Sequence, residues 1–281
     1  MAVLWRFDAV VLAFIVVAGF IALVAHHRTT ITRSLTLLGI LAVLSLALWT
    51  WPLGLIGLAA LLALVGLQEV AKAWGASALW VTVAGGLGLG LGAWHPAMFL
   101  ALPFLAVVAA SWLLPRRWVA TQGFALVLAV LVGVGLAFWA RLAVGGVLVL
   151  VLLLQMNDAF SYFGGHLFGR HHIVSTISPG KTLEGYVAGL VGVGAGVALG
   201  YGPLGLLTGV ALSRVAVVGL YLVIAGDLGD LFFSKLKRHL GIKDFSSLLP
   251  GHGGILDRFD NVIIGAPGFY LLWHLLAMGG H

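Results

Sequence analysis

A short segment of this chain gathers charge that the rest of the sequence avoids. Carboxylate oxygens bind Mg²⁺ and leave it bonds for phosphate oxygens, while Lys and Arg neutralise the remaining charge of a polyphosphate. Acids alone would favour ion transport, and bases alone would favour binding of anionic lipid headgroups. The mixture indicates phosphoryl chemistry at a lipid–water boundary. Charged residues make up 9% of the chain, yet the stretch SKLKRHLGIKDFSSLLPGHGGILDRFDN, residues 234–261, contains Lys235, Lys237, Arg238, Lys243, Asp244, Asp257, Arg258 and Asp260.

Two acids precede this segment in the apolar stretch AGDLGDLFFSKLKR. Asp227 and Asp230 are three residues apart, so on a helix they share a face, and Ser234 follows one turn later. A charge in the middle of a membrane costs about 2.5–3.5 kcal/mol on insertion scales, and an acid kept there is by default a functional candidate. The alternative is that the two acids cap the helix near water or pair with Lys235. Because both lie on one face and a basic run follows, we favour a functional role.

The turn PGHGGILDRFDN combines glycines with a helix start. The Pro-Gly pair at 250–251 predicts a turn, the glycine pair at 253–254 permits unusual backbone angles, and a helix is expected to begin near Asp257. Such a turn presents free backbone N–H groups, which suit phosphate. Asp257 and Asp260 again share a helix face. An acid at a helix start can also act only on the helix dipole, and that alternative suits Asp260 better than Asp257.

A third polar segment, MNDAFSYFGGHLFGRHHIVSTISPGKTLEGY, follows another apolar run. Asn157 and Asp158 are expected to end a span. The stretch from Ser178 to Glu184 has the early proline and the acid of a helix start, which is compatible with a phosphate-binding turn. Its GKT is not a Walker A motif, because Ser175 stands where that motif needs glycine. The histidines of this segment lack the spacing of a metal site, and we expect a solvated loop.

Long apolar runs must position these groups. The 281 residues are 62% hydrophobic, with a mean hydropathy of +1.14, whereas soluble domains have roughly 45–50% apolar residues. Several runs exceed the ~18 uncharged residues of a membrane-spanning helix, so we predict an all-α polytopic membrane protein with roughly nine to ten transmembrane helices. The absence of cysteine excludes disulfides and Cys-ligated metals. The predicted spans are roughly 8–25, 35–50, 54–70, 78–94, 97–114, 121–138, 142–158, 183–209, 215–232 and 260–278.

The basic residues set the expected orientation. Twelve of the 15 Lys and Arg fall in alternate connections, which the positive-inside rule places in the cytoplasm. Topology therefore explains the net charge of +6 without nucleic acid. Two cytoplasmic segments are long, 158–182 and 233–259, and seven of the nine acids lie between residues 158 and 260. We predict a hydrophobic transmembrane scaffold over 1–150 and a catalytic transmembrane region over 151–281. Small-xxx-small glycine spacing over 185–200 predicts close helix contact.

These motifs together resemble the phosphatidate cytidylyltransferases, also called CDP-diacylglycerol synthases. The GDL at 229–231, the Asn-Asp pair at 157–158 and the SPGKT at 178–182 look like family motifs, and recognisable similarity covers roughly 155–262. The match is densest where the family signature has Ser234, Lys237, Arg238, Lys243, Asp244, Pro250, His252, Gly253, Gly254, Asp257, Arg258 and Asp260.

The resemblance implies an activity in phospholipid biosynthesis: CTP and phosphatidic acid give CDP-diacylglycerol and pyrophosphate. The lipid phosphate attacks the α-phosphorus of CTP, and a divalent ion, Mg²⁺, is required, while a second cation such as K⁺ is left open. The resemblance also implies a cytosol-facing polar cavity, a homodimer, and a place in a bacterial-type inner (plasma) membrane with the active site facing the cytoplasm. The partners would be CTP, phosphatidic acid and membrane lipids, with no nucleic acid.

Residue roles follow from matching the motifs to that reaction. Nucleophile and leaving group are both phosphates, so catalysis needs positioning and charge neutralisation and no strong base. Asp230 and Asp257 are expected to hold Mg²⁺. Phe233 stands where the family often has an acid, and either Asp227 compensates as a ligand or that acid is dispensable. His252 either bonds a phosphate oxygen or shapes the turn. The triphosphate is assigned to Lys237, Arg238, Lys243 and Arg258, and the substrate pocket to Asn157, Asp158, Ser178, Lys181, Thr182, Ser234, His252, Gly253 and Gly254.

Rival functions predict other features. A CDP-alcohol phosphotransferase would need Asp-Gly, then Ala-Arg, with later spaced aspartates, and no such run exists. An ion-coupled transporter that uses Asp227 and Asp230 would need inverted repeats, yet the acids are not duplicated in the first half of the chain. A lipid-binding scaffold would show no CTP turnover. The transferase hypothesis in turn requires Asp230 and Asp257 to converge on one cation.

Overall fold

The computed structural model describes residues 4–6, 8–9, 12, 28–94, 124–173, 178 and 180–278 of the chain. The chain divides into two compact units. Unit 1 consists of Met1–Ala9, Leu142–Gly241 and Asp260–His281, and unit 2 consists of Val10–Arg141 and Ile242–Phe259. Each unit therefore brings together segments that are far apart in the sequence. The predicted division into a scaffold and a catalytic region near residue 150 stays a prediction.

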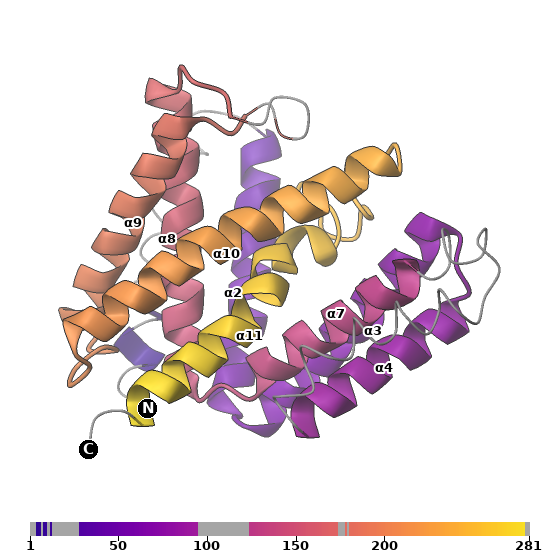
Figure 1. The fold of residues 1–281 in the computed structure, drawn as a ribbon, viewed down its shortest axis with the longest axis horizontal. Helices are drawn as coiled ribbons and strands as arrows, with labels where there is room; N and C mark the ends of the chain where they lie inside the picture. The colour runs from indigo at the N-terminus through magenta and orange to yellow at the C-terminus, as the bar shows by residue number, and fades with distance from the viewer. Residues whose placement is uncertain are drawn as a thin grey trace. The chain divides into compact units, whose positions relative to one another are not determined.

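The described residues are all-α, as predicted, and contain no β-strand (Figure 1). They form α2 (Arg28–Trp49), α3 (Leu53–Trp74), α4 (Ala78–Trp94), α7 (Phe124–Ala140), α8 (Val144–Phe168), α9 (Leu183–Tyr201), α10 (Leu212–His239) and α11 (Leu256–Met278). Within the described ranges, four helices are long and apolar enough to cross a membrane, namely α3, α8, α9 and α10. The predicted spans 8–25 and 97–114 lie largely or wholly outside the described residues, so the total number of spans stays a prediction.

In unit 2, α4 and α7 pack most extensively on each other. Helix α3 packs with both of them, and α2 packs on α3 in turn (Figure 1). Leu55 and Leu67 of α3 and Val132 and Trp139 of α7 are almost completely buried. The predicted break between two spans is confirmed, because α3 begins directly after Pro52. Packing on three helices holds α3 in place, and the side chains that α3 carries are correspondingly fixed.

Unit 1 is built around the contact of α8 with α9, and α10 touches both helices (Figure 1). A Cβ at Gly189 of α9 would stand 2.5 Å from Oδ1 of Asn157 on α8, closer than carbon and oxygen can pack. The predicted close helix contact is therefore confirmed. The buried glycines of α9 are Gly185, Gly189, Gly192, Gly196 and Gly200.

Two helices end at positions that differ from the prediction. Helix α8 continues beyond residue 158 to Phe168, because residues 159–168 are mostly apolar or aromatic and contain no proline. Asp158 therefore lies within a helix and not at its end. Helix α9 ends at Tyr201, short of residue 209, because Pro203 follows closely and lacks the N–H that a helix needs.

Candidate active site

Lys181 binds two of the predicted acids in unit 1. Its Nζ lies 3.1 Å from Oδ2 of Asp230 and 3.7 Å from Oδ1 of Asp227, and it donates to the main-chain oxygen of Asp227 at 3.4 Å. The side chains are 18% exposed for Lys181, 13% for Asp227 and 32% for Asp230. Both acids of α10 thus face the same lysine. The alternative partner considered from the sequence, Lys235, is exposed.

Two further carboxylates adjoin this group. Oδ2 of Asp158 on α8 accepts a hydrogen bond from Nδ2 of Asn261 at 2.9 Å, and the N–H of Asn261 donates to Oδ1 of Asp260 at 2.9 Å. The negative charge of Asp230 repels the charges of both Asp158 and Asp260, so these acids occupy one neighbourhood. We call Asp158, Lys181, Asp227, Asp230 and Asp260 the acidic cluster.

The lysine of the acidic cluster stays charged. Burial lowers the pKa of Lys181, but the Asp230 carboxylate, followed by Tyr186 and Asp227, raises it by more, so the pKa lies above its ordinary value. Lys181 is one ammonium group beside four carboxyl groups, and carboxylate oxygens are the ligands that a divalent cation such as Mg²⁺ prefers.

The donor set fits Mg²⁺ in a particular way. Within the described residues, no group of three or more His, Asp or Glu side chains is placed to hold a metal ion. Mg²⁺ at nucleotide sites is bound by one or two carboxylates together with substrate phosphates, and not by an all-protein cage. The acidic cluster can supply one or two carboxylates, so it fits a metal that arrives with its substrate.

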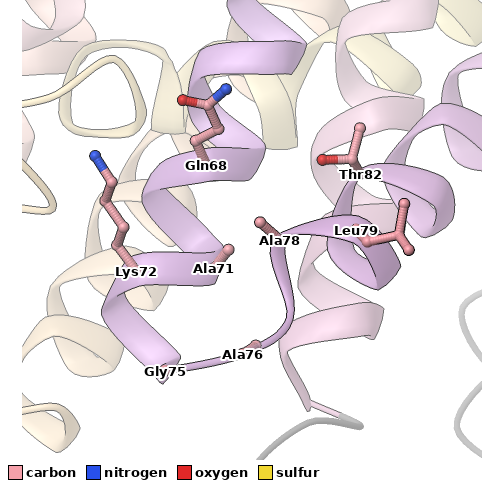
Figure 2. Close-up of a pocket in the computed structure, with 8 residues that line it drawn as sticks. All are labelled: Gln68, Ala71, Lys72, Gly75, Ala76, Ala78, Leu79 and Thr82. Atoms are coloured by element: carbon pink, nitrogen blue, oxygen red, sulfur yellow. The ribbon is translucent and has the colours of Figure 1, made fainter.

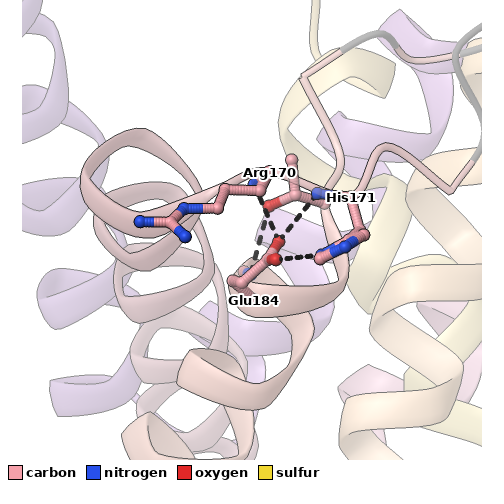
Figure 3. A network of polar contacts seen from close by, with 5 residues as sticks. Arg170, His171 and Glu184 are labelled. Carbon is pink, nitrogen blue, oxygen red and sulfur yellow. Dashed lines mark hydrogen bonds and ion pairs between the residues drawn. The ribbon is translucent and has the colours of Figure 1, made fainter.

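Glu184 holds the loop that carries Lys181 (Figure 3). Its Oε2 accepts the backbone N–H groups of Arg170 at 3.0 Å and His171 at 3.2 Å, and its Oε1 lies 2.6 Å from Nδ1 of His171. His171 and His172 are exposed, as expected for a solvated loop, whereas His166, which is also exposed, lies in the last turn of α8. Three contacts from one carboxylate therefore close this loop onto the first turn of α9.

The predicted helix start at 178–184 is confirmed. Thr182 is the N-cap of α9, and its hydroxyl accepts the N–H of Gly185 at 3.2 Å. The N–H of Lys181 donates to the carbonyl oxygen of Ser178 at 3.2 Å, which makes a turn directly before the cap. The cap and the turn together fix the backbone from which the Lys181 side chain extends.

Replacing Glu184 with Gln is expected to loosen this loop. The amide keeps one acceptor oxygen but loses the charge that strengthens the three contacts. Hydrogen–deuterium exchange of the backbone N–H groups at Arg170 and His171 should become faster than in the wild type. Arg170→Ala is the matched control, because Arg170 contributes its backbone N–H and not its side chain. Unchanged exchange in Glu184→Gln would show that other contacts hold the loop.

Asp257 holds the glycine turn of unit 2. Its Oδ2 accepts the backbone N–H groups of Phe245 and Gly254, both at 2.8 Å, and the residue is 7% exposed. The turn closes on itself through the N–H of Leu249, which donates to the carbonyl oxygen of Gly253 at 2.8 Å. Gly253 has a φ of +82°, a conformation that favours glycine. Asp257 thus ties the beginning of α11 to the segment before the turn.

The predicted free N–H groups at this helix start are already in use, and that prediction is wrong for three of them. Gly254 donates to Asp257, while Ile255 and Leu256 donate to Glu69 on α3, each at 2.9 Å. Sequence reasoning missed Glu69, because the acid is far from the turn along the chain. One signal was present, because Glu69 is an acid inside the predicted span 54–70, and an acid within a membrane span usually has a functional or structural role.

The remaining predicted residues lie in both units. In unit 1, α10 carries Phe233, which is fully buried, so the position where the family often has an acid faces the interior. Asp230 belongs to unit 1 and Asp257 to unit 2, and their sharing of one cation stays a prediction. Arg238, Lys243 and Arg258 are exposed, and Ser234, Lys237 and His252 are half-buried.

Unit 2 has a groove at the connection between α3 and α4 (Figure 2). It has a volume of about 670 Å³. Its polar side chains are few, and none of the predicted site residues borders it. It is lined by Gln68, Ala71, Lys72, Gly75, Ala76, Ala78, Leu79 and Thr82.

The amino-acid sequence matches a family of known proteins and several curated relatives. The chain matches the model of the cytidylyltransferase family over residues 2–276. It is 43% identical over 124 residues to the uncharacterized protein YnbB of Escherichia coli. The aligned residues make up 44% of this chain and 41% of YnbB. It is 38% identical over 125 residues to proteins named phosphatidate cytidylyltransferase from Staphylococcus saprophyticus, with 43% of this chain and 46% of the relative covered, and from Aquifex aeolicus, with 44% and 46% covered. The matched segment thus spans about half the length of these curated relatives.

Proposed function

We propose, on the premise that this chain belongs to the cytidylyltransferase family, that it transfers the cytidylyl group of CTP to phosphatidic acid. The products are CDP-diacylglycerol and pyrophosphate. The observation that carries the proposal is the acidic cluster, in which Lys181 lies against Asp227 and Asp230 within an apolar unit. The names of the Staphylococcus saprophyticus and Aquifex aeolicus relatives support the choice of substrate.

The reaction asks little of acid–base chemistry. A phosphate oxygen of phosphatidic acid bonds to the α-phosphorus of CTP, and the bond from that phosphorus to the oxygen bridging to the β-phosphate breaks. The nucleophile is already ionised, and the leaving group is pyrophosphate, so neither step needs a strong base. The protein must hold two polyanions together and reduce their repulsion. Charged groups at fixed positions meet that need.

The carboxylates are proposed to bind the metal. Asp230 and Asp257 hold Mg²⁺, with Asp227 as a further ligand and K⁺ as a candidate second cation. Bound Mg²⁺ supplies positive charge to the phosphates of CTP. Asp230 suits this role because it is the most exposed member of the group around Lys181. Asp227 is held by the same lysine. Its position supports the proposal that Asp227 replaces the acid that the family often has at the position of Phe233.

The cations and the polar pocket are proposed to bind the substrates. Asn157 and Thr182 are only 1% and 3% exposed. They are therefore proposed to act on the substrate pocket through their chain neighbours, Asp158 and Lys181. Gly253 and Gly254 shape the turn that carries His252. The triphosphate and the leaving pyrophosphate contact Lys237, Arg238, Lys243 and Arg258, and the remaining pocket residues are Asp158, Ser178, Lys181 and Ser234.

The membrane context is proposed from the charge pattern and the relatives. The chain is an integral membrane protein, since its described helices include four that could cross a membrane. Nine to ten spans, a cytosol-facing cavity, a homodimer and a place in a bacterial inner membrane belong to the proposal. The excess of Lys and Arg in alternate connections supports a cytoplasmic active site.

One assay tests the proposed function. Purified protein with labelled CTP and phosphatidic acid should form CDP-diacylglycerol with Mg²⁺, stop when EDTA is added, and resume when Mg²⁺ is restored in excess. ATP in place of CTP is the matched control for nucleotide choice. Activity that survives EDTA would rule out the metal. Absence of any CTP turnover by folded protein would favour a lipid-binding scaffold, and consumption of CDP-diacylglycerol with an alcohol would favour a phosphotransferase.

A further inference from the structure

Glu69 is a buried carboxylate that belongs to α3 but binds the segment around the glycine turn. It is 4% exposed. Its Oε1 accepts hydrogen bonds from Oγ of Ser246 at 2.6 Å and from the N–H of Ile255 at 2.9 Å, and its Oε2 accepts the N–H of Leu256 at 2.9 Å. All three donors come from residues 242–259, which belong with Glu69 to unit 2. A buried charge is thereby compensated by one short stretch of chain.

Two carboxylates, those of Asp257 and Glu69, bind the backbone and side-chain donors of residues 242–259. Asp257 binds the N–H groups of Phe245 and Gly254, and Glu69 binds the next donor on each side, at Ser246 and at Ile255. The two ends of the turn are thus drawn together by two acids, one local and one from α3. The first N–H groups of a helix have no partner within the helix, and here these carboxylates supply one.

The backbone at Gly254 approaches the Glu69 carboxylate closely. A Cβ at Gly254 would stand 2.7 Å from Oε2 of Glu69, closer than carbon and oxygen can pack. The tip of the turn is held separately, by Oγ1 of Thr36 on α2, which donates to the carbonyl oxygen of Pro250 at 2.9 Å. Residues 242–259 are therefore held by two helices, α2 and α3, from the part of the chain that the sequence predicts to be scaffold.

We propose that Glu69 is a positioning residue for the side chains of residues 242–259 that are assigned to the phosphates of CTP. Lys243, His252 and Arg258 extend from the backbone that Glu69 and Asp257 hold, so their spacing depends on both carboxylates. The inference rests on the proposed function, because those side chains are taken to bind the phosphates of CTP. Pre-organised cations bind a polyanion without first losing conformational freedom, and binding weakens when the backbone that holds them is free to move.

The test compares Glu69→Gln with Gln68→Ala, an exposed neighbour on α3 that has no part in the site. Glu69→Gln keeps the size of the side chain but turns one acceptor oxygen into a donor. The KM for CTP should rise about tenfold or more, while size-exclusion profiles of the detergent-solubilised protein stay like those of the wild type. Ser246→Ala removes one of the three contacts and should raise the KM less. Gln68→Ala should leave the KM unchanged.

The possible outcomes separate this inference from the proposed function. If the wild type turns over CTP and Glu69→Gln lowers only the apparent kcat, in proportion to the folded fraction, Glu69 is merely structural and the inference is overturned. An unchanged KM with unchanged folding overturns it as well. If the wild type itself fails to turn over CTP, the proposed function fails and the positioning role falls with it. A raised KM in well-folded Glu69→Gln supports the inference.

Discussion

Asp230→Asn is expected to reduce the CTP-dependent synthesis of CDP-diacylglycerol at least about a hundredfold, with the protein still folded. The substitution keeps the shape of the side chain and removes its charge. Asp230 lies 3.1 Å from Nζ of Lys181 and is 32% exposed, so it is both held in place and open to a ligand. Initial rates at saturating CTP, with the folded fraction measured in parallel, check the result.

Two further variants test whether the loss of activity is specific to Asp230. Asp8→Asn removes an acid of unit 1 that lies outside the acidic cluster, and it should leave the rate unchanged. Asp227→Asn should cause a smaller loss than Asp230→Asn, because Asp227 is the less exposed of the two. Near-normal activity in Asp230→Asn would remove that residue from the metal site. A complete loss in Asp227→Asn would mean that the wrong acid of the pair was assigned to the metal.

The proposed role of Asp230 as a metal ligand must be separated from its ion pair with Lys181. If Asp230 only held Lys181, Lys181→Met would be equally damaging, and neither variant would change the Mg²⁺ concentration needed for half-maximal rate. A metal ligand behaves differently, because its loss weakens the affinity for the cation. Residual activity in Asp230→Asn should therefore need more Mg²⁺ than residual activity in Lys181→Met.

The helices were predictable from the sequence because their cause is local. The span predicted over 54–70 is α3, which runs over Leu53–Trp74, and the glycines of 185–200 lie at the helix contact that their spacing indicated. Apolar runs and small-residue spacing act over one or two turns. Helix ends were less predictable where they depend on one or two residues, as at Pro203, or where an apolar run continues past a polar pair, as at Asp158.

The partners of the acids could not be read from the sequence, because they come from other elements. Lys235 is near Asp227 and Asp230 along the chain, yet the lysine that binds them is Lys181, from the loop before α9. Glu69 lies even farther along the chain from its partners, the N–H groups of Ile255 and Leu256 at the start of α11. Burial of a carboxylate demands compensation from some donor. The sequence shows which carboxylates will need a hydrogen-bond donor, but only the packing of the helices determines which residue supplies that donor.

Asp257 combines the two kinds of role, because it is a proposed metal ligand that also holds the backbone. Hydrogen bonds to a charged acceptor contribute roughly 1.5–3 kcal/mol each. Asp257 accepts two of them, from Phe245 and Gly254 at 2.8 Å, and is 7% exposed. A loss of activity in a variant of Asp257 therefore has two possible causes, a missing metal ligand or a displaced turn. The substitution must be one that distinguishes these causes.

Asp257→Asn is that variant, since the amide oxygen can still accept both N–H groups while the charge is gone. We expect the free energy of unfolding to fall by about 1–2 kcal/mol, and synthesis of CDP-diacylglycerol to fall at least about a hundredfold per folded molecule. Hydrogen–deuterium exchange at Phe245 and Gly254 reports on the turn, and the Mg²⁺ dependence of the residual rate reports on the ligand. Ser247→Ala, an exposed change in the same segment, should alter neither. Normal activity per folded molecule, with faster exchange at those two N–H groups, would leave Asp257 only the task of holding the turn.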